Sequence, residues 1–406
     1  MRIVYIVQRL VYPPDAGTPI RNYSLIIRAA RDHEVHAFGF TDEKKYPQPL
    51  ERAGVYLHLL PTPPERTRWQ RLTTVLTSAL PDMAHRSYSE ALVGSLKRQL
   101  ASLHPEIVQV QALDMAYTIA TVRTVAPAAY LILDQHNAEY ILQRRALAVD
   151  ARSLRRWPQA AYSLVQWLRL RSYERSVCNR CDLVLAVSAK DAQALRRLGL
   201  SAPIAIVPNG IDLPQVETVV PEETVRHLPG HHFVFPGKMD YRPNVDAAVW
   251  FAQAVFPEVR KRLPQAHLWL VGRQPHPSVA ALANQPGIHV TGEVLDVWPY
   301  IAAATAIVAP LRMGAGTKLK VLEAAALCKP LIATSIGAEG YAASAGRDFL
   351  LADSAAELAE ACVNVANDPH LAARLGANAH EHLARPLNWD RIYQMLQDLY
   401  ERPCGG

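Results

Sequence analysis

Short apolar runs rich in β-branched residues alternate along this chain with segments of helical periodicity. In the first half the runs are Ile3–Val7, Val35–Phe40, Val55–Leu60, Ile107–Gln111, Tyr130–Asp134 and Leu183–Ser188. In the second half they are His232–Pro236, Leu268–Gly272, His289–Gly292, Ala306–Pro310, Leu331–Thr334 and Phe349–Leu351. Runs of this length, separated by helical segments, are typical of parallel strands whose sheet is covered by helices. The pattern therefore predicts an α/β protein with two such sheets.

The two series of runs are separated by Val207–Asp212, where a proline and an Asn-Gly pair interrupt the pattern. The chain has 406 residues, of which 50% are hydrophobic, so each half can bury a core of its own. We expect a first domain over 1–208, a second over 209–385 and a terminal helix over 386–406 that, by analogy, packs back on the first domain. The clearest helix candidates are Pro19–Asp32, Glu90–Leu103, Lys190–Leu198, Val245–Arg262, Lys318–Leu327, Ala355–Ala366 and Trp389–Tyr400.

Composition argues against several classes of protein. No run reaches the roughly 18 consecutive apolar residues of a membrane-spanning helix, and Met1 leads directly into the first strand candidate rather than into a secretory signal. We therefore expect a cytoplasmic protein. The close pair Cys178 and Cys181 has no second pair with which to form a zinc site. Basic residues exceed acidic ones by six, but they accompany no nucleic-acid-binding motif, so we expect no nucleic-acid partner.

The positive charge is concentrated between Arg144 and Arg180. This stretch holds nine arginines and only two acidic residues, Asp150 and Glu174. It also carries aromatic side chains, namely Trp157, Tyr162, Trp167 and Tyr173. Such a stretch is either a solvated helix face or a basic, aromatic surface that contacts an anionic membrane or a lipid-linked acceptor.

Ligands of parallel α/β domains bind at the carboxyl ends of the strands, here in a cleft between the two domains, so the strand-to-helix junctions are the candidate sites. The most informative junction follows Ala306–Pro310. Its glycines allow close approach of a ligand, and Thr317 is placed to cap a helix whose positive end would face a phosphate. Lys320 and Glu323 share one helix face, where they suit a diphosphate and a ribose diol, or simply form an ordinary ion pair. A nucleotide-sugar donor carries both groups, and the predicted donor-binding residues here are Gly314, Ala315, Gly316, Thr317, Lys318, Lys320 and Glu323.

A second junction follows His232–Pro236. Lys238 comes directly after Gly237 at the strand end, where its charge would stabilise a departing phosphate, and Arg242 is a plausible helper. A lysine in a loop is by itself a weak signal. We predict Gly237, Lys238 and Arg242 as donor-binding residues.

Two further junctions lie in the first half. In the loop after Ile3–Val7, Gly17 and Pro19 predict a helix start with exposed amides, so Gly17 is a predicted donor-binding residue, and Asp15 is a candidate on the acceptor side. This loop has neither the G-x-G-x-x-G nor the P-loop pattern, which disfavours a nicotinamide, flavin or Walker-type site. The junction Asp134–Glu139 is unusually polar. Here His136 is placed to contact sugar hydroxyls or shuttle a proton, and Asn137 and Glu139 are acceptor-side candidates.

No Asp-x-Asp motif occurs in the sequence. A divalent-metal clamp on the diphosphate is therefore not expected, and lysines and helix ends must supply the positive charge. We expect no metal and no cofactor; the nucleotide sugar is a substrate.

Taken together, these motifs resemble glycosyltransferase family 4, the retaining enzymes of the GT-B fold with two Rossmann-like domains, and in particular members associated with bacterial polysaccharides. The segments that carry the resemblance are the first strand with Gly17, Asp134–Glu139, Val187-Ser188, Pro208–Asp212, Gly237-Lys238, Val271-Gly272, Val290–Gly292 with Asp296-Val297, and Gly314–Pro330.

The resemblance also implies roles for individual residues. Glu323 resembles the second glutamate of the E-x7-E motif, which holds the donor ribose, and Lys238 resembles the basic residue that contacts the diphosphate. His136 resembles the histidine beside the transferred sugar, and Gly17 the loop glycine near the donor phosphate or the acceptor. Backbone groups of Gly314–Gly316 would meet sugar hydroxyls and phosphate. On this reading, His136, Lys238 and Glu323 are the candidate catalytic residues.

Two positions depart from the family pattern. Ala315 stands where the first glutamate of E-x7-E is usual, and Asn244 stands where a second basic residue is usual, so Lys318 or Lys320 is a candidate substitute. We expect a metal-independent transfer of a hexose from a nucleotide sugar to a hydroxyl group of a glycan, a lipid-linked acceptor or a small molecule. A nucleotide-sugar epimerase of the same architecture and a non-catalytic carbohydrate- or lipid-binding homologue are the alternatives.

Overall fold

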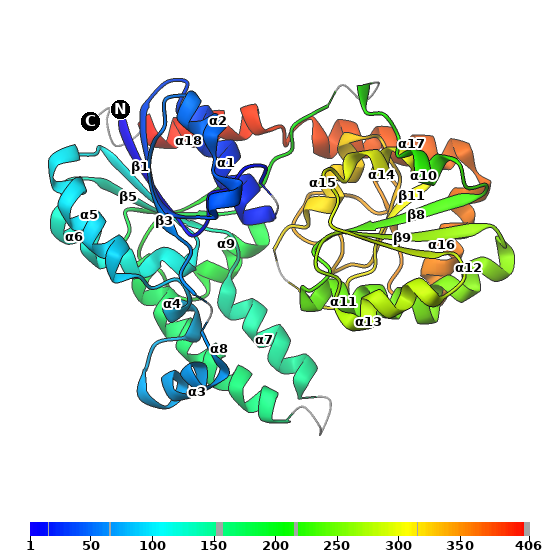
Figure 1. The fold of residues 1–406 in the computed structure, drawn as a ribbon, viewed down its shortest axis with the longest axis horizontal. Coiled ribbons are helices and arrows are strands. Elements are labelled where there is room, and N and C mark those ends of the chain that lie inside the picture. The colour runs from blue at the N-terminus through cyan, green and yellow to red at the C-terminus, as the bar shows by residue number, and fades with distance from the viewer. Residues whose placement is uncertain (15, 65, 152–156, 215–217, 315, 402–406) are drawn as a thin grey trace. The chain divides into compact units, whose positions relative to one another are not determined.

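The apolar runs of the sequence form two parallel sheets in the computed structural model of the protein (Figure 1). The structure describes residues 1–14, 16–64, 66–151, 157–214, 218–314 and 316–401. The chain divides into unit 1, Met1–Asn209 with Trp389–Gly406, and unit 2, Gly210–Asn388. The predicted α/β class is thereby confirmed.

Unit 1 contains a seven-stranded sheet in its described residues, with the order β3-β2-β1-β4-β5-β6-β7 and parallel pairing throughout. The strands are β1 (Arg2–Val7), β2 (Glu34–Thr41), β3 (Tyr56–Pro61), β4 (Ile107–Gln111), β5 (Tyr130–Gln135), β6 (Leu183–Ala186) and β7 (Ile204–Ile206). The α-helices are α1 (Gly17–Ala29), α2 (Gln48–Arg52), α3 (Arg68–Thr77), α4 (Asp82–Arg86), α5 (Glu90–Leu103), α6 (Ile119–Val125), α7 (Glu139–Asp150), α8 (Trp157–Cys178), α9 (Ala189–Arg196) and α18 (Trp389–Glu401). Short 3-10 helices are η1 (Glu43–Lys45) and η2 (Leu113–Thr118).

Unit 2 contains a six-stranded sheet in its described residues, with the order β10-β9-β8-β11-β12-β13. The strands are β8 (His231–Pro236), β9 (Ala266–Val271), β10 (Ile288–Gly292), β11 (Ala306–Ala309), β12 (Leu331–Ala333) and β13 (Leu350–Leu351). The helices are α10 (Glu223–Arg226), α11 (Arg242–Trp250), η5 (Phe251–Val255), α12 (Phe256–Arg262), α13 (Pro277–Ala280), η6 (Ala281–Asn284), α14 (Trp298–Ala303), α15 (Leu319–Ala326), α16 (Ala355–Asn367), α17 (Pro369–Ala379) and η7 (His380–Ala384).

Residues of one strand alternate between the two faces of the sheet, and each face has its own core. In unit 2, Phe233 and Phe235 pack against α11, α12 and α16, whereas Val234 packs on the opposite side with α14 and α15. Figure 1 shows α14 and α15 on one face of this sheet and α11 on the other. Burial on both faces explains why the strand candidates are continuous apolar runs rather than alternating ones.

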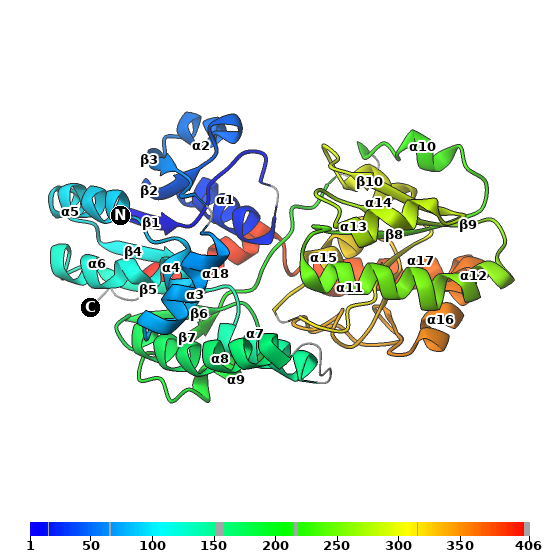
Figure 2. The same ribbon diagram turned by 60° about the horizontal axis from the view of Figure 1, so that its bottom comes forward.

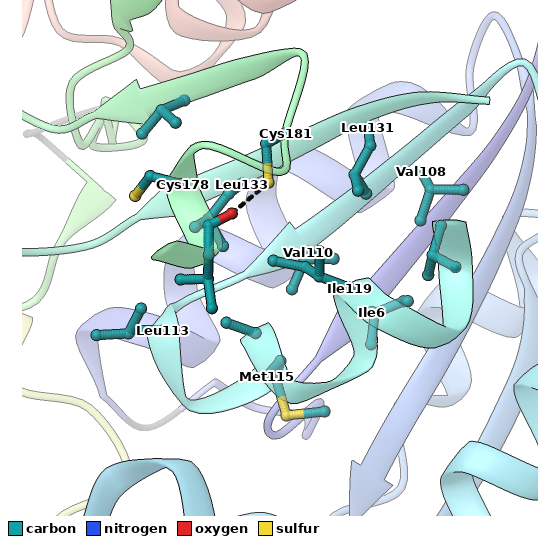
Figure 3. Close-up of a cluster of buried hydrophobic side chains, with 14 of the residues drawn as sticks. Ile6, Val108, Val110, Leu113, Met115, Ile119, Leu131, Leu133, Cys178 and Cys181 are labelled. Atoms are coloured by element: carbon teal, nitrogen blue, oxygen red, sulfur yellow. Dashed lines mark hydrogen bonds between the residues drawn. The ribbon is translucent and has the colours of Figure 1, made fainter. Parts of the chain in front are cut away.

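The core of unit 1 includes the close cysteine pair. Cys178 and Cys181 are buried with Leu133 among the aliphatic side chains of β4, β5 and α6 (Figure 3). The Cys181 thiol donates a weak hydrogen bond to the Val177 carbonyl, 3.4 Å away. Burial raises the pKa of Cys181 to about 12. Within the described residues, no group of three or more His, Cys, Asp or Glu side chains is arranged to hold a metal ion.

The terminal helix α18 belongs to unit 1. The Tyr400 hydroxyl lies 2.9 Å from that of Tyr5 and donates to Oε1 of Gln109 at 2.5 Å. Asp390, at the start of the helix, pairs with Arg28 and Arg31 of the α1 region at 2.9 Å each. A buried hydrogen-bonded connection and a surface ion-pair cluster therefore hold α18 against the first sheet.

The structure differs from the sequence prediction in one helix and in one strand. The predicted helix Val245–Arg262 contains a π-helical turn, η5, because Pro257 has no amide for the helical ladder. Figure 2 shows α11 and α12 in line, as one continuous run of helix. The short edge strand β7 was not predicted, since a strand of three residues is too short to show a pattern. None of the described helices combines the length and apolar composition needed to cross a membrane.

Candidate functional site

The strand order reverses between β8 and β11 in unit 2 and between β1 and β4 in unit 1. At such a point the loops after neighbouring strands diverge to opposite faces, and the carboxyl ends of the strands leave room for a ligand. The predicted site residues follow β8 and β11 in unit 2, and β1 and β5 in unit 1.

Gly237, directly after β8, lies against residues from two helices. A Cβ atom at this position would lie 2.8 Å from Nδ2 of Asn244 and 3.3 Å from Nζ of Lys320. Asn244, in α11, donates from Nδ2 to the Lys238 carbonyl at 2.9 Å and accepts from Lys320 Nζ at 3.3 Å. The structure thus brings Gly237 and Lys320, two predicted donor-site residues, to one point.

Lys320 is buried in α15, and its ammonium lies 3.8 Å from the ring centre of Phe235. Burial lowers the pKa of Lys320 to about 7, although the neighbouring carboxylate of Glu323 opposes this effect. Burial likewise raises the pKa of Glu323 to about 7. A cation and a carboxylate held on one helix face with the pKa of each near neutrality are typical of a functional site.

The loop after β11 requires glycine. Gly314 and Gly316 have φ of 132° and 68°, a region in which side chains with a Cβ are strained. Lys318 is buried and its Nζ donates to the Gly316 carbonyl. Of the two candidate substitutes for a second basic residue, Lys320 therefore contacts Asn244, and Lys318 supports the glycine loop. Ala315 lies outside the described residues.

The predicted capping role of Thr317 is wrong. The helix α15 begins at Leu319, so the cap position is Lys318, whose extended backbone makes no side-chain cap. Thr317 instead packs against the turn at Gly340, where a Cβ would lie 2.8 Å from its methyl carbon. The close packing against Gly340 holds Thr317 in place before the helix begins, so Thr317 does not take the cap position.

The two remaining donor-side candidates of unit 2 are exposed. Lys238 forms an ion pair with Asp240, with Nζ 3.1 Å from Oδ2. Arg242 is the first residue of α11. Both side chains are long and at the surface, so ligand binding can reorient them without disturbing the core.

Unit 1 places Gly17 at the first position of α1, two residues earlier than the start predicted at Pro19. Among the described residues, no atom would lie within 4 Å of a Cβ at Gly17. Packing inside the unit therefore does not require glycine at this position. Asp15 lies outside the described residues.

His136, at the end of β5, is held from both sides. Its Nδ1 lies 3.1 Å from Oγ1 of Thr18, and its Nε2 lies 3.1 Å from Oε1 of Gln111. Burial lowers the pKa of His136 to about 4, so the ring is neutral at pH 7. With Nε2 donating to the amide oxygen, Nδ1 accepts from Thr18. A neutral ring with both nitrogens engaged is suited to hydrogen bonding and positioning more than to proton shuttling.

Arg21 was not recognised as important from the sequence. It is 1% exposed and donates from Nε and Nη2 to both carboxylate oxygens of Asp134, at 2.9 and 3.0 Å. It also donates to the backbone carbonyls of Val207 and Pro208. Asp134 is the first residue of the polar junction Asp134–Glu139. Through Arg21 it holds α1 and the end of β7 against β5. No local sequence pattern reveals this role.

Asn137 and Glu139 lie together after β5. Nδ2 of Asn137 donates to Oε1 of Glu139 at 3.1 Å. Burial, and next the negative charge of Asp114, raise the pKa of Glu139 to about 7. The fully buried Glu174 accepts from the backbone amides of Glu139 and Tyr140 at 3.2 and 3.1 Å and so caps α7. Glu174 and Asp114 are further polar residues that the sequence analysis missed.

Two family models match the chain. Residues 23–215 match the model described as Glycosyltransferase Family 4, and residues 230–368 match the model described as Glycosyl transferases group 1. No curated protein matches the sequence.

Solved structures of similar fold cover nearly the whole chain. Sucrose-phosphate synthase from Thermosynechococcus elongatus has 18% identity and a TM-score of 0.74, with 100% of this chain and 99% of that chain covered. HepE from Anabaena, solved in complex with UDP and glucose, has 14% identity and a TM-score of 0.68, with 99% of each chain covered. WaaG, a glycosyltransferase involved in lipopolysaccharide biosynthesis, has 15% identity and a TM-score of 0.66, with 98% of this chain and 99% of that chain covered. The likeness confirms the predicted GT-B fold.

Proposed function

We propose, from the premise that this chain belongs to the glycosyltransferases of family 4 and has the GT-B fold, that it transfers a hexose from a nucleotide sugar to a hydroxyl group. The observation that carries the proposal is the buried ammonium of Lys320 beside Gly237, at the point where the strand order of unit 2 reverses. The structures of HepE with UDP and with UDP-glucose support a nucleotide-sugar donor.

In this proposal the donor lies at the carboxyl ends of β8 and β11. The diphosphate meets Lys320, Lys238 and the amides of the loop Gly314–Gly316, with Arg242 as a helper. Glu323 accepts hydrogen bonds from the ribose hydroxyls. Positive charge fixed where negative charge develops on the leaving group is the largest contribution that a protein makes to such a reaction.

The proposed transfer retains the anomeric configuration. The bond between the anomeric carbon and the diphosphate oxygen breaks, and the acceptor oxygen forms its bond from the same face. The proton of the acceptor hydroxyl passes to the departing phosphate oxygen. Because lysines supply the positive charge, we expect activity to persist in excess EDTA. The configuration of the product, measured by proton NMR of the anomeric signal, tests retention.

Unit 1 provides the acceptor side of the proposal. His136 hydrogen-bonds the transferred sugar, and Gly17 leaves room beside α1 for a phosphate or an acceptor group. Asp15, Asn137 and Glu139 bind acceptor hydroxyls. We further propose that the acceptor is lipid-linked and presented at an anionic membrane. The arginines of α7 and α8 support such an acceptor.

A donor screen tests the function directly. Purified protein is incubated with a panel of nucleotide sugars and acceptors, and released nucleoside diphosphate is measured. We expect release that depends on the acceptor and is lost in the double variant Lys238→Ala/Glu323→Ala. Turnover of that variant at the wild-type rate would contradict the proposal. Conversion of the donor sugar without any acceptor would instead indicate an epimerase, and absence of nucleotide binding would indicate a non-catalytic homologue.

A further inference from the structure

Helices α3 and α8 lie side by side on unit 1 (Figure 1). Nη2 of Arg169 in α8 donates to the Val75 carbonyl in α3 at 2.7 Å, which joins the two helices. The start of α3 is fixed by a capping box between Thr67 and Gln70. Helix α3 therefore packs on the side of α8 that carries Arg169.

One side of α8 faces the interior. Ser163, Gln166 and Leu170 are buried, and Trp167 and Tyr173 pack partly against the core of unit 1. Two of the four aromatic residues predicted for a basic helical face are thus turned inward. Further apolar residues of α8 lie on its other side.

That other side is apolar and exposed. Trp157, Leu164 and Leu168 are 60%, 43% and 54% exposed. Their spacing of seven and four residues places them in one stripe along a helix. A helix that is apolar on both sides and has one side bare is typical of a docking site.

The charges around the stripe have one sign. Arg171 and Arg175 are exposed, and at 3.6 residues per turn they continue the line of Trp157, Leu164 and Leu168. The acidic residues of α7 and α8 do not offset them, because Glu174 and Asp150 are buried and Glu139 is half-buried.

We propose that this surface of α8, formed by Trp157, Leu164 and Leu168 with Arg171 and Arg175, docks on an anionic lipid bilayer. Tryptophan favours the headgroup region, leucine enters the acyl boundary, and arginine binds lipid phosphate. A symmetric contact between two copies would bring arginines against arginines, so a bilayer fits the charge better than a second copy does. The inference rests on the membrane-presented acceptor of the proposed function and names the residues that meet the membrane.

Co-sedimentation of the full protein with vesicles tests this docking. We expect binding to phosphatidylcholine vesicles that contain phosphatidylglycerol, weaker binding to phosphatidylcholine alone, and a decrease with added salt. Replacement of Arg171 and Arg175 by Gln should weaken binding to anionic vesicles by on the order of 30-fold, since each basic residue contributes about 1 kcal/mol. The variant Leu164→Gln/Leu168→Gln should lose at least tenfold.

A matched control is Leu295→Gln, which changes a fully exposed leucine in unit 2 and should bind vesicles like the wild type. Circular dichroism confirms that each variant is folded, and nucleotide binding is measured in the same samples. Wild-type protein that binds nucleotide but not anionic vesicles overturns the docking surface and leaves the proposed transfer intact. Dimerisation that the two leucine substitutions abolish, without any effect on vesicle binding, also overturns it and indicates a protein interface.

Discussion

The Nζ atom of Lys320 lies 3.3 Å from Oδ1 of Asn244, although the two residues are 76 positions apart and belong to different helices. Asn244 does not neutralise the charge of Lys320, because its amide oxygen accepts a hydrogen bond without carrying a full negative charge. The ammonium is buried beside a glycine and an aromatic ring at the end of β8. A cation placed in this way can interact strongly with an incoming diphosphate.

We predict that Lys320→Met weakens binding of a nucleoside diphosphate by about 10- to 100-fold, because a hydrogen bond to a charged group contributes about 1.5–3 kcal/mol. Isothermal titration calorimetry measures the affinity. Lys329→Met is the matched control: Lys329 is partly buried and likewise donates a hydrogen bond, to the Ala304 carbonyl at 3.1 Å, but it lies beyond the end of α15. Equal losses of nucleotide affinity in the two variants would show that Lys320 contributes to the stability of the fold and not to nucleotide binding.

Nucleotide binding should also take up a proton at pH 8. The free protein holds the pKa of Lys320 at about 7 through burial, so at pH 8 most of this side chain is neutral. A bound diphosphate favours the ammonium and raises the pKa, and affinity therefore falls as the pH rises above 7. Calorimetry in buffers of different ionisation enthalpy should show uptake approaching one proton in the wild type. In Lys320→Met the uptake should disappear, and its persistence would point to another group.

Glu323 is predicted to recognise the ribose rather than the phosphates. The variant Glu323→Gln should bind a nucleoside diphosphate about tenfold more weakly, as expected for loss of a charge-assisted hydrogen bond. Its affinity for inorganic pyrophosphate should stay the same or increase, because the carboxylate near Lys320 is removed. Competition between the two ligands separates these effects. A parallel loss for both ligands is incompatible with a ribose contact.

The sheets could be predicted from the sequence because both faces of each sheet are buried. A strand such as Ile3–Val7 is then a continuous apolar run, and its boundaries follow from the polar residues at its ends. Strand β7 and helix α3 could not be predicted, because neither shows a clear apolar pattern. Three residues in β7 are too few for a pattern, and α3 mixes apolar residues such as the exposed Trp69 with polar ones.

The candidate site could be predicted only as far as local spacing reaches. Lys320 and Glu323 are three residues apart on one helix, so their shared face is visible in the sequence. The contact of Lys320 with Asn244 depends on how α11 and α15 pack around β8, and no local pattern records it. Arg21 shows the same limit more strongly, because an arginine in an amphipathic helix indicates a surface residue, whereas here its partner is 113 positions away.

Glu139 should make acceptor binding depend on pH. Burial, followed by the charge of Asp114, raises the pKa of its carboxyl group to about 7, so ionisation rises from about a tenth at pH 6 to about nine tenths at pH 8. The ionised form accepts a stronger hydrogen bond from a hydroxyl group. The KM for the acceptor should therefore fall by about tenfold over this range, whereas Glu139→Gln should show a flat profile. An unchanged profile in the variant would remove Glu139 from the acceptor site.

The ion pair between Arg21 and Asp134 should dominate the stability of unit 1. Both side chains are at most 1% exposed, and Asp134→Ala leaves a guanidinium buried without its counter-charge. Breaking such a pair costs about 3–5 kcal/mol, whereas an exposed pair contributes about 0–1 kcal/mol. Glu381→Gln, which breaks the exposed pair of Glu381 with Arg385, is the control.

Urea-induced unfolding followed by circular dichroism measures both variants. Because Arg21 also holds the carbonyls of Val207 and Pro208, Asp134→Ala should in addition expose this segment to limited proteolysis, while Glu381→Gln should not. The double variant Arg21→Met/Asp134→Leu should regain part of the loss, since it removes the buried charge along with its partner. A loss below about 1 kcal/mol in Asp134→Ala would show that water reaches Arg21 and that the pair does not fix α1 to β5.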